Sequence, residues 1–298
     1  MIRRKLGKSA LEISEVSFGC MSLGEDEREN IFLLHKSLEL GINYFDTADL
    51  YQHGKNEETL GKAFKDKRDK VIIASKAGNQ WRADGSGWDW NPRKDYILSC
   101  ADNSLKRLQT DYIDLFQLHG GTIEDNIDET IDAFEILVKA GKIRYYGISS
   151  IRPNVIREYV KRSNIVSVMM QYSLLDRRPE EECLQILHDN HIGVLARGSL
   201  AKGLLAGKPA TPYLNYSTDQ VQEMAQAVKS ISGKARTAAQ TAIHYVLANS
   251  AITSAVTGIR TKEQLEELAA TPLMQLLTEQ ELETLSLVIP ANLYDSHR

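Results

Sequence analysis

The chain has 298 residues, of which 42% are hydrophobic and 26% are charged, an ordinary composition for a globular protein with a large core. Its net charge of −4 argues against a nucleic-acid-binding protein, which usually carries a surplus of basic residues, but permits an anionic small ligand. No apolar run reaches the roughly 20 residues of a membrane helix, and the basic N-terminus lacks the apolar stretch of a signal peptide.

Residues 3–14 alternate in polarity on either side of Gly7, which predicts a small N-terminal β-hairpin that plugs the bottom of a barrel. From residue 16 onward, short apolar β-prone runs alternate with longer amphipathic stretches. The predicted strands are 16–19, 44–47, 71–76, 113–119, 145–149, 166–171, 193–197 and 254–258. The predicted helices are 29–41, 56–64, 94–108, 126–141, 154–163, 179–190, 235–250 and 261–270. Residues 277–289 predict one extra C-terminal helix, with Thr278 as its N-cap.

Eight strand–helix units in succession predict an α/β fold, a parallel (β/α)8 TIM barrel with the hairpin plug and the extra C-terminal helix. No linker or low-complexity tract interrupts residues 1–298, so we expect a single domain. A doubly wound sheet is the alternative, and it would require a glycine-rich phosphate loop after the first strand.

Titratable residues gather where the predicted strands end. Asp46 ends the second strand, Lys76 the third and His119 the fourth, and Tyr51 follows Asp46 in the next loop. Active sites of barrels lie at the carboxyl ends of the strands, and neighbouring strands are about 4.8 Å apart. These four side chains are therefore expected to converge on one spot.

The residue types indicate proton transfer to a carbonyl oxygen. A free tyrosine has a pKa of about 10, too high for efficient proton exchange at neutral pH, and a nearby cation favours the phenolate. Lys76 would supply that cation, Asp46 would hold Lys76 in place, and Tyr51 would act as general acid. Neutral His119 could orient the same oxygen by a hydrogen bond. No activated nucleophile is present, so covalent catalysis is not indicated. The arrangement suits reduction of a carbonyl by a hydride, which a cofactor must supply.

Five ordered segments resemble the aldo-keto reductase superfamily: INYFDTADLYQHGKNEETLG, IIASKAG, LKRLQTDYIDLFQLH, GKIRYYGISS and MMQYSLLDRR. The resemblance is nearest to bacterial members of the inositol-dehydrogenase-like and stress-response branch. It implies a catalytic tetrad of Asp46, Tyr51, Lys76 and His119. It also implies NADPH (NADP+ when oxidised) bound extended across the barrel mouth without a Rossmann fingerprint, and a small carbonyl compound as substrate.

The resemblance carries a set of cofactor-binding residues onto this chain. In the family, a serine after strand 5 and a glutamine ending strand 6 hold the nicotinamide amide, and the segment after strand 8 binds the adenosine 2′-phosphate. The cofactor-binding residues implied here are Gly19, Cys20, Met21, Asp46, Ser149, Ser150, Gln171, Arg197, Gly198, Ser199, Leu200, Lys202, Gly203, Gly258, Arg260, Thr261, Gln264 and Glu267.

Three positions depart from the family pattern. Ser150 replaces the usual asparagine and is shorter. Arg197 stands where an aromatic ring usually stacks on the nicotinamide, and its planar guanidinium can also stack on a ring or reach a phosphate. Leu268 follows Glu267 where the family has a Glu-Asn pair on the adenine, so we expect weaker recognition of the adenine. Arg260 is the candidate for a bidentate contact with the 2′-phosphate.

The loop after the third strand holds all three tryptophans, Trp81, Trp88 and Trp90. Loops above the strand ends shape the substrate pockets of barrels, so we expect one or two of them, first Trp81 and Trp88, to wall the pocket. The other possibility is that they pack the loop onto the barrel rim. Met21, Tyr51 and His119 complete the expected substrate site.

Two other functions stay open from the sequence. One is a non-catalytic NADP(H)-binding redox sensor or regulatory subunit, resembling potassium-channel β subunits. The other is a metal-dependent barrel hydrolase or isomerase, but only Asp46 and His119 offer ligands at the strand ends, so we expect no metal. No obligate protein partner is evident. Three widely spaced cysteines without a CxxC pattern suit a reducing compartment, and we expect a cytoplasmic protein.

Overall fold

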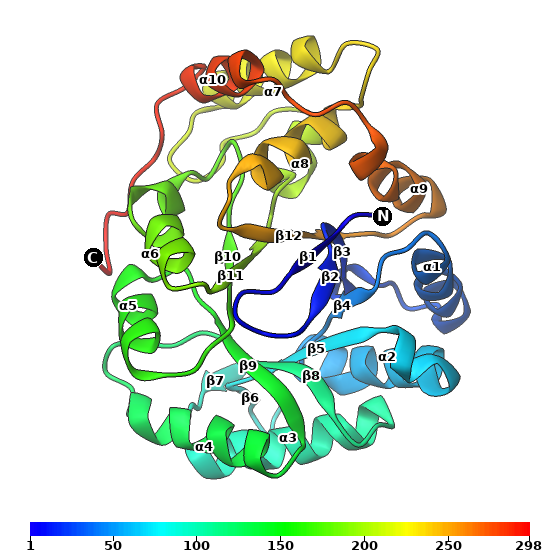
Figure 1. The fold of residues 1–298 in the computed structure, drawn as a ribbon, viewed down its shortest axis with the longest axis vertical. Coiled ribbons are helices and arrows are strands. Elements are labelled where there is room, and N and C mark those ends of the chain that lie inside the picture. The colour runs from blue at the N-terminus through cyan, green and yellow to red at the C-terminus, as the bar shows by residue number, and fades with distance from the viewer.

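The computed structural model describes residues 1–298 and forms a closed barrel of eight parallel strands surrounded by helices (Figure 1). The strands are β3 (Val16–Gly19), β4 (Tyr44–Asp46), β5 (Ile72–Ala77), β8 (Ile113–Leu118), β9 (Ile143–Ser149), β10 (Ser167–Gln171), β11 (Gly193–Arg197) and β12 (Ile252–Gly258). They pair in chain order, and β12 closes the barrel on β3. The predicted (β/α)8 barrel is confirmed, with every strand in its predicted place.

The outer ring consists of α1 (Glu27–Glu39), α2 (Lys55–Phe64), α3 (Lys94–Leu108), α4 (Ile127–Lys139), α5 (Pro153–Arg162), α6 (Cys183–Asp189), α7 (Thr218–Ser232), α8 (Ala238–Ala248), α9 (Lys262–Ala269) and α10 (Glu279–Leu287). Helix α10 is the predicted C-terminal helix, and Thr278 caps it as expected. Helix α7 is an addition that the strand–helix alternation does not predict. It begins with a capping box of Ser217 and Gln220, which satisfies backbone N–H groups that would otherwise lack partners.

The N-terminal hairpin closes one end of the barrel, as predicted. Strands β1 (Arg3–Lys5) and β2 (Glu12–Ser14) are antiparallel and lie across the centre of the ring (Figure 1). Leu6 and Ile13 are fully buried and belong to the cluster that fills the barrel interior. Gly7 has φ +53°, and a Cβ there would lie 2.4 Å from the carbonyl oxygen of Val166, so only glycine fits this turn.

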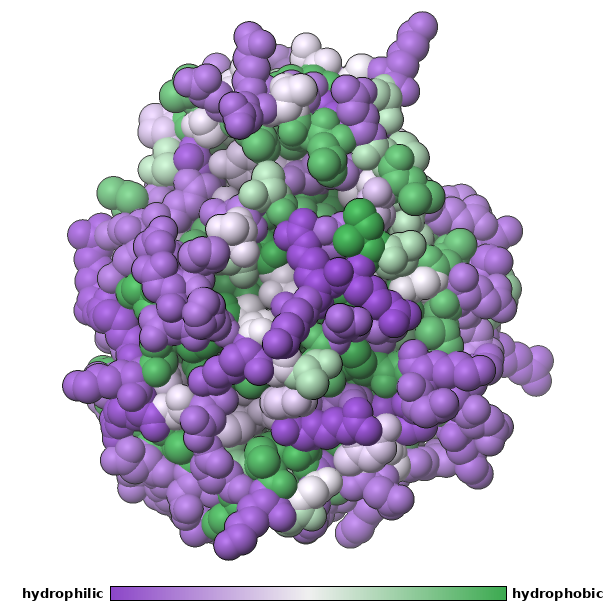
Figure 2. Space-filling view, viewed as in Figure 1, coloured by the Kyte–Doolittle hydropathy of each residue, from purple (hydrophilic) through white to green (hydrophobic).

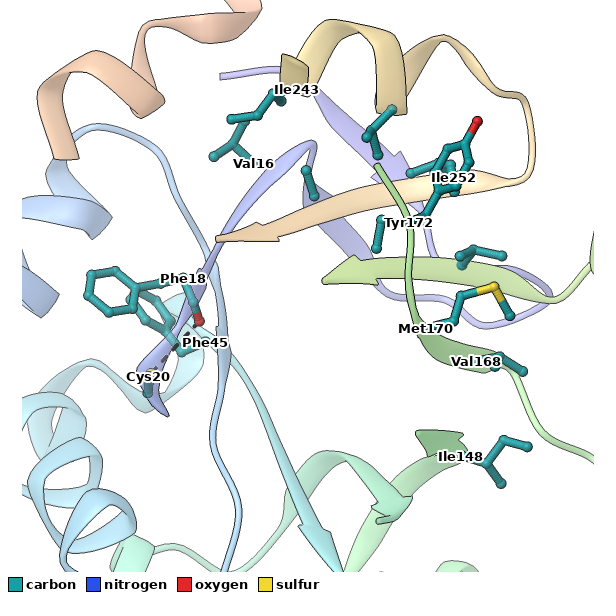
Figure 3. Close-up of a cluster of buried hydrophobic side chains, with 14 of the residues drawn as sticks. Val16, Phe18, Cys20, Phe45, Ile148, Val168, Met170, Tyr172, Ile243 and Ile252 are labelled. Atoms are coloured by element: carbon teal, nitrogen blue, oxygen red, sulfur yellow. Dashed lines mark hydrogen bonds between the residues drawn. The ribbon is translucent and has the colours of Figure 1, made fainter. Parts of the chain in front are cut away.

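The main hydrophobic core lies between the barrel and its helices. Phe18, Phe45, Val168 and Met170 belong to it, and Figure 3 shows them around the strands from which they project. The face of the molecule that carries the hairpin is largely hydrophilic, with scattered hydrophobic residues between the polar ones (Figure 2). No helix combines the length and the apolar character needed to cross a membrane.

Three segments rise from the carboxyl ends of the strands. After β4, a 3-10 turn over Tyr51–Gly54 contains Gln52 and His53 in the left-handed conformation, with φ of 51° and 54°. After β5, strands β6 (Asn79–Trp81) and β7 (Trp88–Trp90) form a hairpin. After β11, the 3-10 turn Ala201–Ala206 again has positive φ at non-glycine residues. Positive φ at a non-glycine residue is costly, and such residues gather at functional sites.

Candidate active site

Lys76 is the centre of a buried polar cluster at the carboxyl end of β5. Its side chain is fully enclosed, and its Nζ donates to Asp46 Oδ1 at 2.5 Å and to the carbonyl oxygen of Thr47 at 2.7 Å. A third contact joins Nζ to the Tyr51 hydroxyl oxygen at 3.4 Å. An ammonium group has three N–H bonds, so all of them are engaged. Three of the four tetrad residues predicted from the sequence therefore meet at one atom.

The electrostatics of this cluster favour a lysine cation beside an aspartate anion. Burial acts to lower the pKa of Lys76, but the charge of Asp46 and the contact with Tyr51 outweigh burial, and the pKa is raised. Burial raises the pKa of Asp46 as well, while the Lys76 ammonium and the Gln117 amide oppose that rise. With the two charges 2.5 Å apart, we take both groups as ionised at neutral pH.

Tyr51 is positioned by the strained turn that follows it. Its ring meets the His119 ring edge to face, with centroids 5.8 Å apart and planes at 82°. The neighbouring His53 stacks on Trp81 at a centroid distance of 3.9 Å, and Trp81 Nε1 donates to the carbonyl oxygen of Leu50 at 3.3 Å. The β6–β7 hairpin thus holds the residues on both sides of Tyr51, and Lys76 Nζ lies 5.0 Å from the centroid of the Tyr51 ring.

His119 follows the last residue of β8 and completes the tetrad. Burial lowers the pKa of His119 to about 3, and the positive charges of Lys76 and Arg197 contribute to this shift. The imidazole is therefore neutral at physiological pH. Its Nδ1 is buried without a hydrogen-bond partner, which leaves Nε2 as the nitrogen open to a ligand. The tautomer with a proton on Nε2 can donate a hydrogen bond to an oxygen placed there.

Two groups of this polar cluster were not predicted from the sequence. Gln117 is fully buried, and its Nε2 donates to Asp46 Oδ2 at 3.2 Å. The sequence does hold a signal for it, because Gln117 precedes His119 by two residues, and alternate residues of a strand share a face. The other is the carbonyl oxygen of Thr47, a backbone group that the loop alone positions and that no residue pattern identifies.

The predicted nicotinamide-binding residues lie on the opposite wall of the barrel mouth. Ser149 ends β9, Gln171 ends β10 and Arg197 ends β11, where Gln171 and Arg197 are direct neighbours in the register. Arg197 Nη1 donates to Gln171 Oε1 at 3.0 Å, and Gln171 Nε2 donates to the Tyr213 hydroxyl at 3.0 Å. The sequence reasoning missed Tyr213, since it lies in a loop without a recognisable motif.

The segment after Arg197 curls beside this wall. Ser199 is 2% exposed, and its buried Oγ has no partner within the protein. Gly198 and Gly203 have positive φ, as does Lys202, and Leu200 is half-buried. A groove of about 380 Å³ follows, lined by Lys202, Leu204, Lys208, Pro209, Thr211, Pro212 and Tyr213. Two lysines give this groove a positive charge.

The predicted phosphate-binding segment forms the end of β12 and the start of α9. Arg260 is exposed, and its guanidinium makes no ion pair within the protein, whereas its backbone N–H donates to Gln264 Oε1 at 3.0 Å. Thr261 caps α9 by accepting from the backbone N–H of Gln264 at 3.3 Å. Gly258 is exposed and Glu267 half-buried. The side chains of Thr261 and Gln264 are thus occupied in shaping the turn, and Arg260 is left free.

The residues after β3 have contrasting environments. Gly19 pairs with Asp46 across the β3–β4 ladder. Cys20 is fully buried, and burial, followed by the charge of Asp46, raises the pKa of its thiol. Met21 is 71% exposed. Of the two, only Met21 has a side chain accessible to a bound molecule.

The three tryptophans have different surroundings. Trp81 stacks on His53 beside Tyr51. Trp88 is 49% exposed on the same hairpin. Trp90 covers Gly78 and Gly120 and donates from Nε1 to the Asp125 carboxylate at 3.0 Å. Trp90 therefore anchors the hairpin to the barrel rim, while Trp81 and Trp88 remain near the mouth. No group of three or more His, Cys, Asp or Glu side chains is placed to hold a metal ion.

Comparison with known proteins shows which proteins this chain is similar to. The model of the aldo/keto reductase family matches residues 15–288. The uncharacterized oxidoreductase YqkF of Bacillus subtilis (strain 168) is 50% identical over 307 residues, with both chains fully covered. The holo form of aldo-keto reductase AKR11C1 from Bacillus halodurans is 47% identical with a TM-score of 0.94, covering 100% of this chain and 99% of that one. A Schizosaccharomyces pombe (strain 972) protein, named aldo-keto reductase yakc (NADP(+)), is 32% identical, over 70% of this chain and 64% of its own.

Proposed function

Because the chain belongs to the aldo/keto reductase family, we propose that it is an NADPH-dependent oxidoreductase that reduces the carbonyl group of an aldehyde or small ketone to an alcohol. The observation that carries this proposal is the arrangement of the three N–H bonds of Lys76. Each N–H has its own acceptor: the Asp46 carboxylate, the Thr47 carbonyl oxygen and the Tyr51 hydroxyl oxygen. The Tyr51 oxygen therefore accepts from Lys76, and its own proton is free for a substrate.

The chain's own residues supply the proton and the orientation. Tyr51 donates its proton to the carbonyl oxygen as general acid, and the adjacent Lys76 ammonium stabilises the negative charge that develops on the tyrosine oxygen. Neutral His119 donates a hydrogen bond from Nε2 to the same oxygen and fixes its position. Bound NADPH would supply the hydride that the carbonyl carbon receives.

The residues around the mouth fit a nicotinamide dinucleotide phosphate. The Gln171 and Ser149 side chains can bind a carboxamide, and the buried unpartnered Ser199 Oγ has free hydrogen-bonding capacity. The unpaired Arg260 guanidinium suits a 2′-phosphate. A relative is named with NADP(+), which agrees with this choice of cofactor. The other predicted cofactor residues, Gly258, Thr261 and Gln264 among them, shape this surface.

We expect Arg260→Ala to weaken NADPH binding far more than NADH binding. The 2′-phosphate is the difference between the two cofactors, and the loss of a charge-assisted contact costs about 1.5–3 kcal/mol. Dissociation constants from fluorescence titration would measure this effect. Lys262→Ala is the matched control, because Lys262 lies 3.6 Å from Glu266 and is already paired. Equal losses for both cofactors in the Arg260 variant would move the phosphate site elsewhere, for example to Lys202.

We expect Arg197→Ala to weaken cofactor binding by about 1–2 kcal/mol, the size of a desolvated cation–π or charge-assisted contact. Arg197→Tyr should be tolerated, because an aromatic ring keeps the face-on contact with the nicotinamide. The arginine charge also disfavours the oxidised, cationic ring, so the wild type should prefer NADPH over NADP+ more than the Tyr variant does. Titration of both redox forms tests this. Unchanged constants in both variants would mean that Arg197 only supports Gln171.

The test of the proposed function is a cofactor titration followed by turnover on aldehydes, ketones and polyols. A rate above the spontaneous oxidation of NADPH supports the enzyme. Tight cofactor binding without turnover on any carbonyl would instead support the second candidate, a non-catalytic NADP(H)-binding redox sensor or regulatory subunit. The tetrad itself fits both, and its complete proton-donating arrangement favours the enzyme.

Three finer assignments accompany the proposal. Residues 1–298 would form one catalytic domain, and the three free buried cysteines suit a cytoplasmic location. Trp81, Trp88 and Met21 would wall the substrate site over Tyr51 and His119. Placement in the inositol-dehydrogenase-like and stress-response branch stays a proposal, because the relatives compared above carry no such name.

A further inference from the structure

We propose that Gln117 is a positioning residue of this site, whose side-chain amide holds the Asp46 carboxylate ionised and correctly oriented against Lys76. The inference deepens the proposed reductase function and rests on it. It concerns a residue outside the tetrad that has no expected contact with substrate or cofactor.

The contacts of Asp46 show why its orientation depends on Gln117. Lys76 from β5 takes Oδ1 at 2.5 Å, and Gln117 from β8 takes Oδ2 at 3.2 Å. Gln117 and Lys76 are direct neighbours in the β5–β8 register, and both are fully buried. Each carboxylate oxygen thus has one side-chain partner, from a different strand. Without Gln117, Oδ2 would be buried with no donor, and the carboxylate could turn about its Cβ–Cγ bond.

The Gln117 amide faces Asp46 with its N–H group, and this orientation favours the charged form of the carboxyl group. Gln117 Oε1 is buried without a partner, as is the Tyr44 hydroxyl on the strand that bears Asp46. Turning the amide over would set Oε1 against a carboxylate oxygen, and two acceptors repel each other. An N–H donor facing Asp46 favours the charged form of the carboxyl group, which can only accept. Gln117 therefore counteracts the effect of burial and preserves the anion that keeps Lys76 a cation.

Several titratable groups surround this pair and bear on any pH dependence. Tyr44 and Asp46 lie on β4, Lys76 lies on β5, and Cys20 follows β3. The charge of Arg197 acts on Asp46, and Tyr51 acts on Lys76. Burial raises the pKa of both Cys20 and Tyr44 well above the ordinary values, so neither titrates in the neutral range. A carboxyl group introduced at position 117 would accordingly interact most directly with Asp46, the hydrogen-bond partner of Gln117, and with Lys76, its neighbour in the register.

The first experiment compares Gln117→Leu with Leu115→Ala. Leu115 is a fully buried residue two positions earlier on the same face of β8, and it has no polar contact with the tetrad. Gln117→Leu should lower kcat for carbonyl reduction roughly tenfold to hundredfold with little change in KM, because misplaced catalytic groups reduce the chemical step. Leu115→Ala should lower Tm but change kcat less than about twofold, since it touches packing only.

The second experiment uses Gln117→Glu and needs no cofactor. A protonated Glu at position 117 can still donate to Asp46, but an ionised one sets two carboxylates side by side. Its folded-state pKa would be raised, so the stability it confers is present below the unfolded value of about 4.3 and lost as pH rises through the folded value. Tm of Gln117→Glu should therefore fall relative to the wild type between pH 5 and pH 8. The same substitution in an Asp46→Asn background should lack that fall, because Lys76 can then pair with the new carboxylate.

The role of Gln117 and the reductase function fail on different results. A kcat of Gln117→Leu like that of the wild type would overturn the inference, as would a Tm fall in Gln117→Glu that is the same with and without Asp46. A wild type that turns over no carbonyl would overturn the proposed reductase function, whatever the melting curves show. A Tm fall in Gln117→Glu that disappears in the Asp46→Asn background, together with the kcat loss in Gln117→Leu, would establish Gln117 as a positioning residue.

Discussion

Tyr51→Phe is expected to lose carbonyl reduction by about 10²–10⁴-fold, the contribution of a positioned general acid. The variant removes only the hydroxyl, whose oxygen lies 3.4 Å from Lys76 Nζ and whose proton is free for a substrate. The ring remains, and with it the edge-to-face contact with His119, so the fold and the cofactor site should be undisturbed. Steady-state kinetics with a reactive aldehyde would measure the loss.

The control for this prediction is the affinity for NADPH, which should change little because Tyr51 lies away from Arg260 and the phosphate segment. Tyr159→Phe offers a matched control on helix α5, since it also removes only a buried tyrosine hydroxyl, and that hydroxyl has no hydrogen-bond partner. It should retain most of the turnover number. A Tyr51→Phe variant that keeps most of its activity would show that another group supplies the proton, and the proposed role of the tetrad would be wrong.

Lys76→Met is expected to lose reduction and also to lower the free energy of unfolding by about 3–5 kcal/mol, because it leaves a buried carboxylate without its counter-ion. The loss of stability should depend on pH. Without the Lys76 ammonium, which opposes the effect of burial, the pKa of Asp46 would be raised further. Stability would therefore be retained below the unfolded value of about 3.9 and lost as pH rises through the folded value. Denaturant unfolding at pH 4 and pH 8 would measure the difference.

The double variant Asp46→Asn/Lys76→Met separates charge from packing. Replacing both partners of a buried ion pair is often close to neutral, so much of the lost stability should return. Activity should not return, because the cation beside Tyr51 is still missing. If Lys76→Met proved as stable as the wild type at pH 8, the buried charge of Asp46 would have to be relieved by another group, and the ion pair would not hold the site together.

The local sequence determined the barrel and the tetrad. Strands buried on both faces appear as continuous apolar runs, and their alternation with amphipathic stretches has few other solutions, so all eight strands were predictable. Asp46, Lys76 and His119 were visible as polar residues at strand ends, where barrel geometry brings neighbours together. Helix α7 was also encoded, with the Ser217 cap and buried Val221, Met224 and Val228, but a scheme of eight strand–helix units has no place for it.

The tertiary structure alone decided how these residues are joined. Gln117 reaches Asp46 across the intervening strand β5, a contact between residues 71 positions apart that depends on the register of three strands and on side-chain rotamers. The Thr47 carbonyl accepts from Lys76 because of the path of a loop, and a backbone group leaves no trace in residue type. Trp90 packs on two glycines while Trp81 stacks on His53, although both belong to one hairpin. Periodicity reports the face on which a side chain lies, but the partner on that face depends on the closure of the barrel.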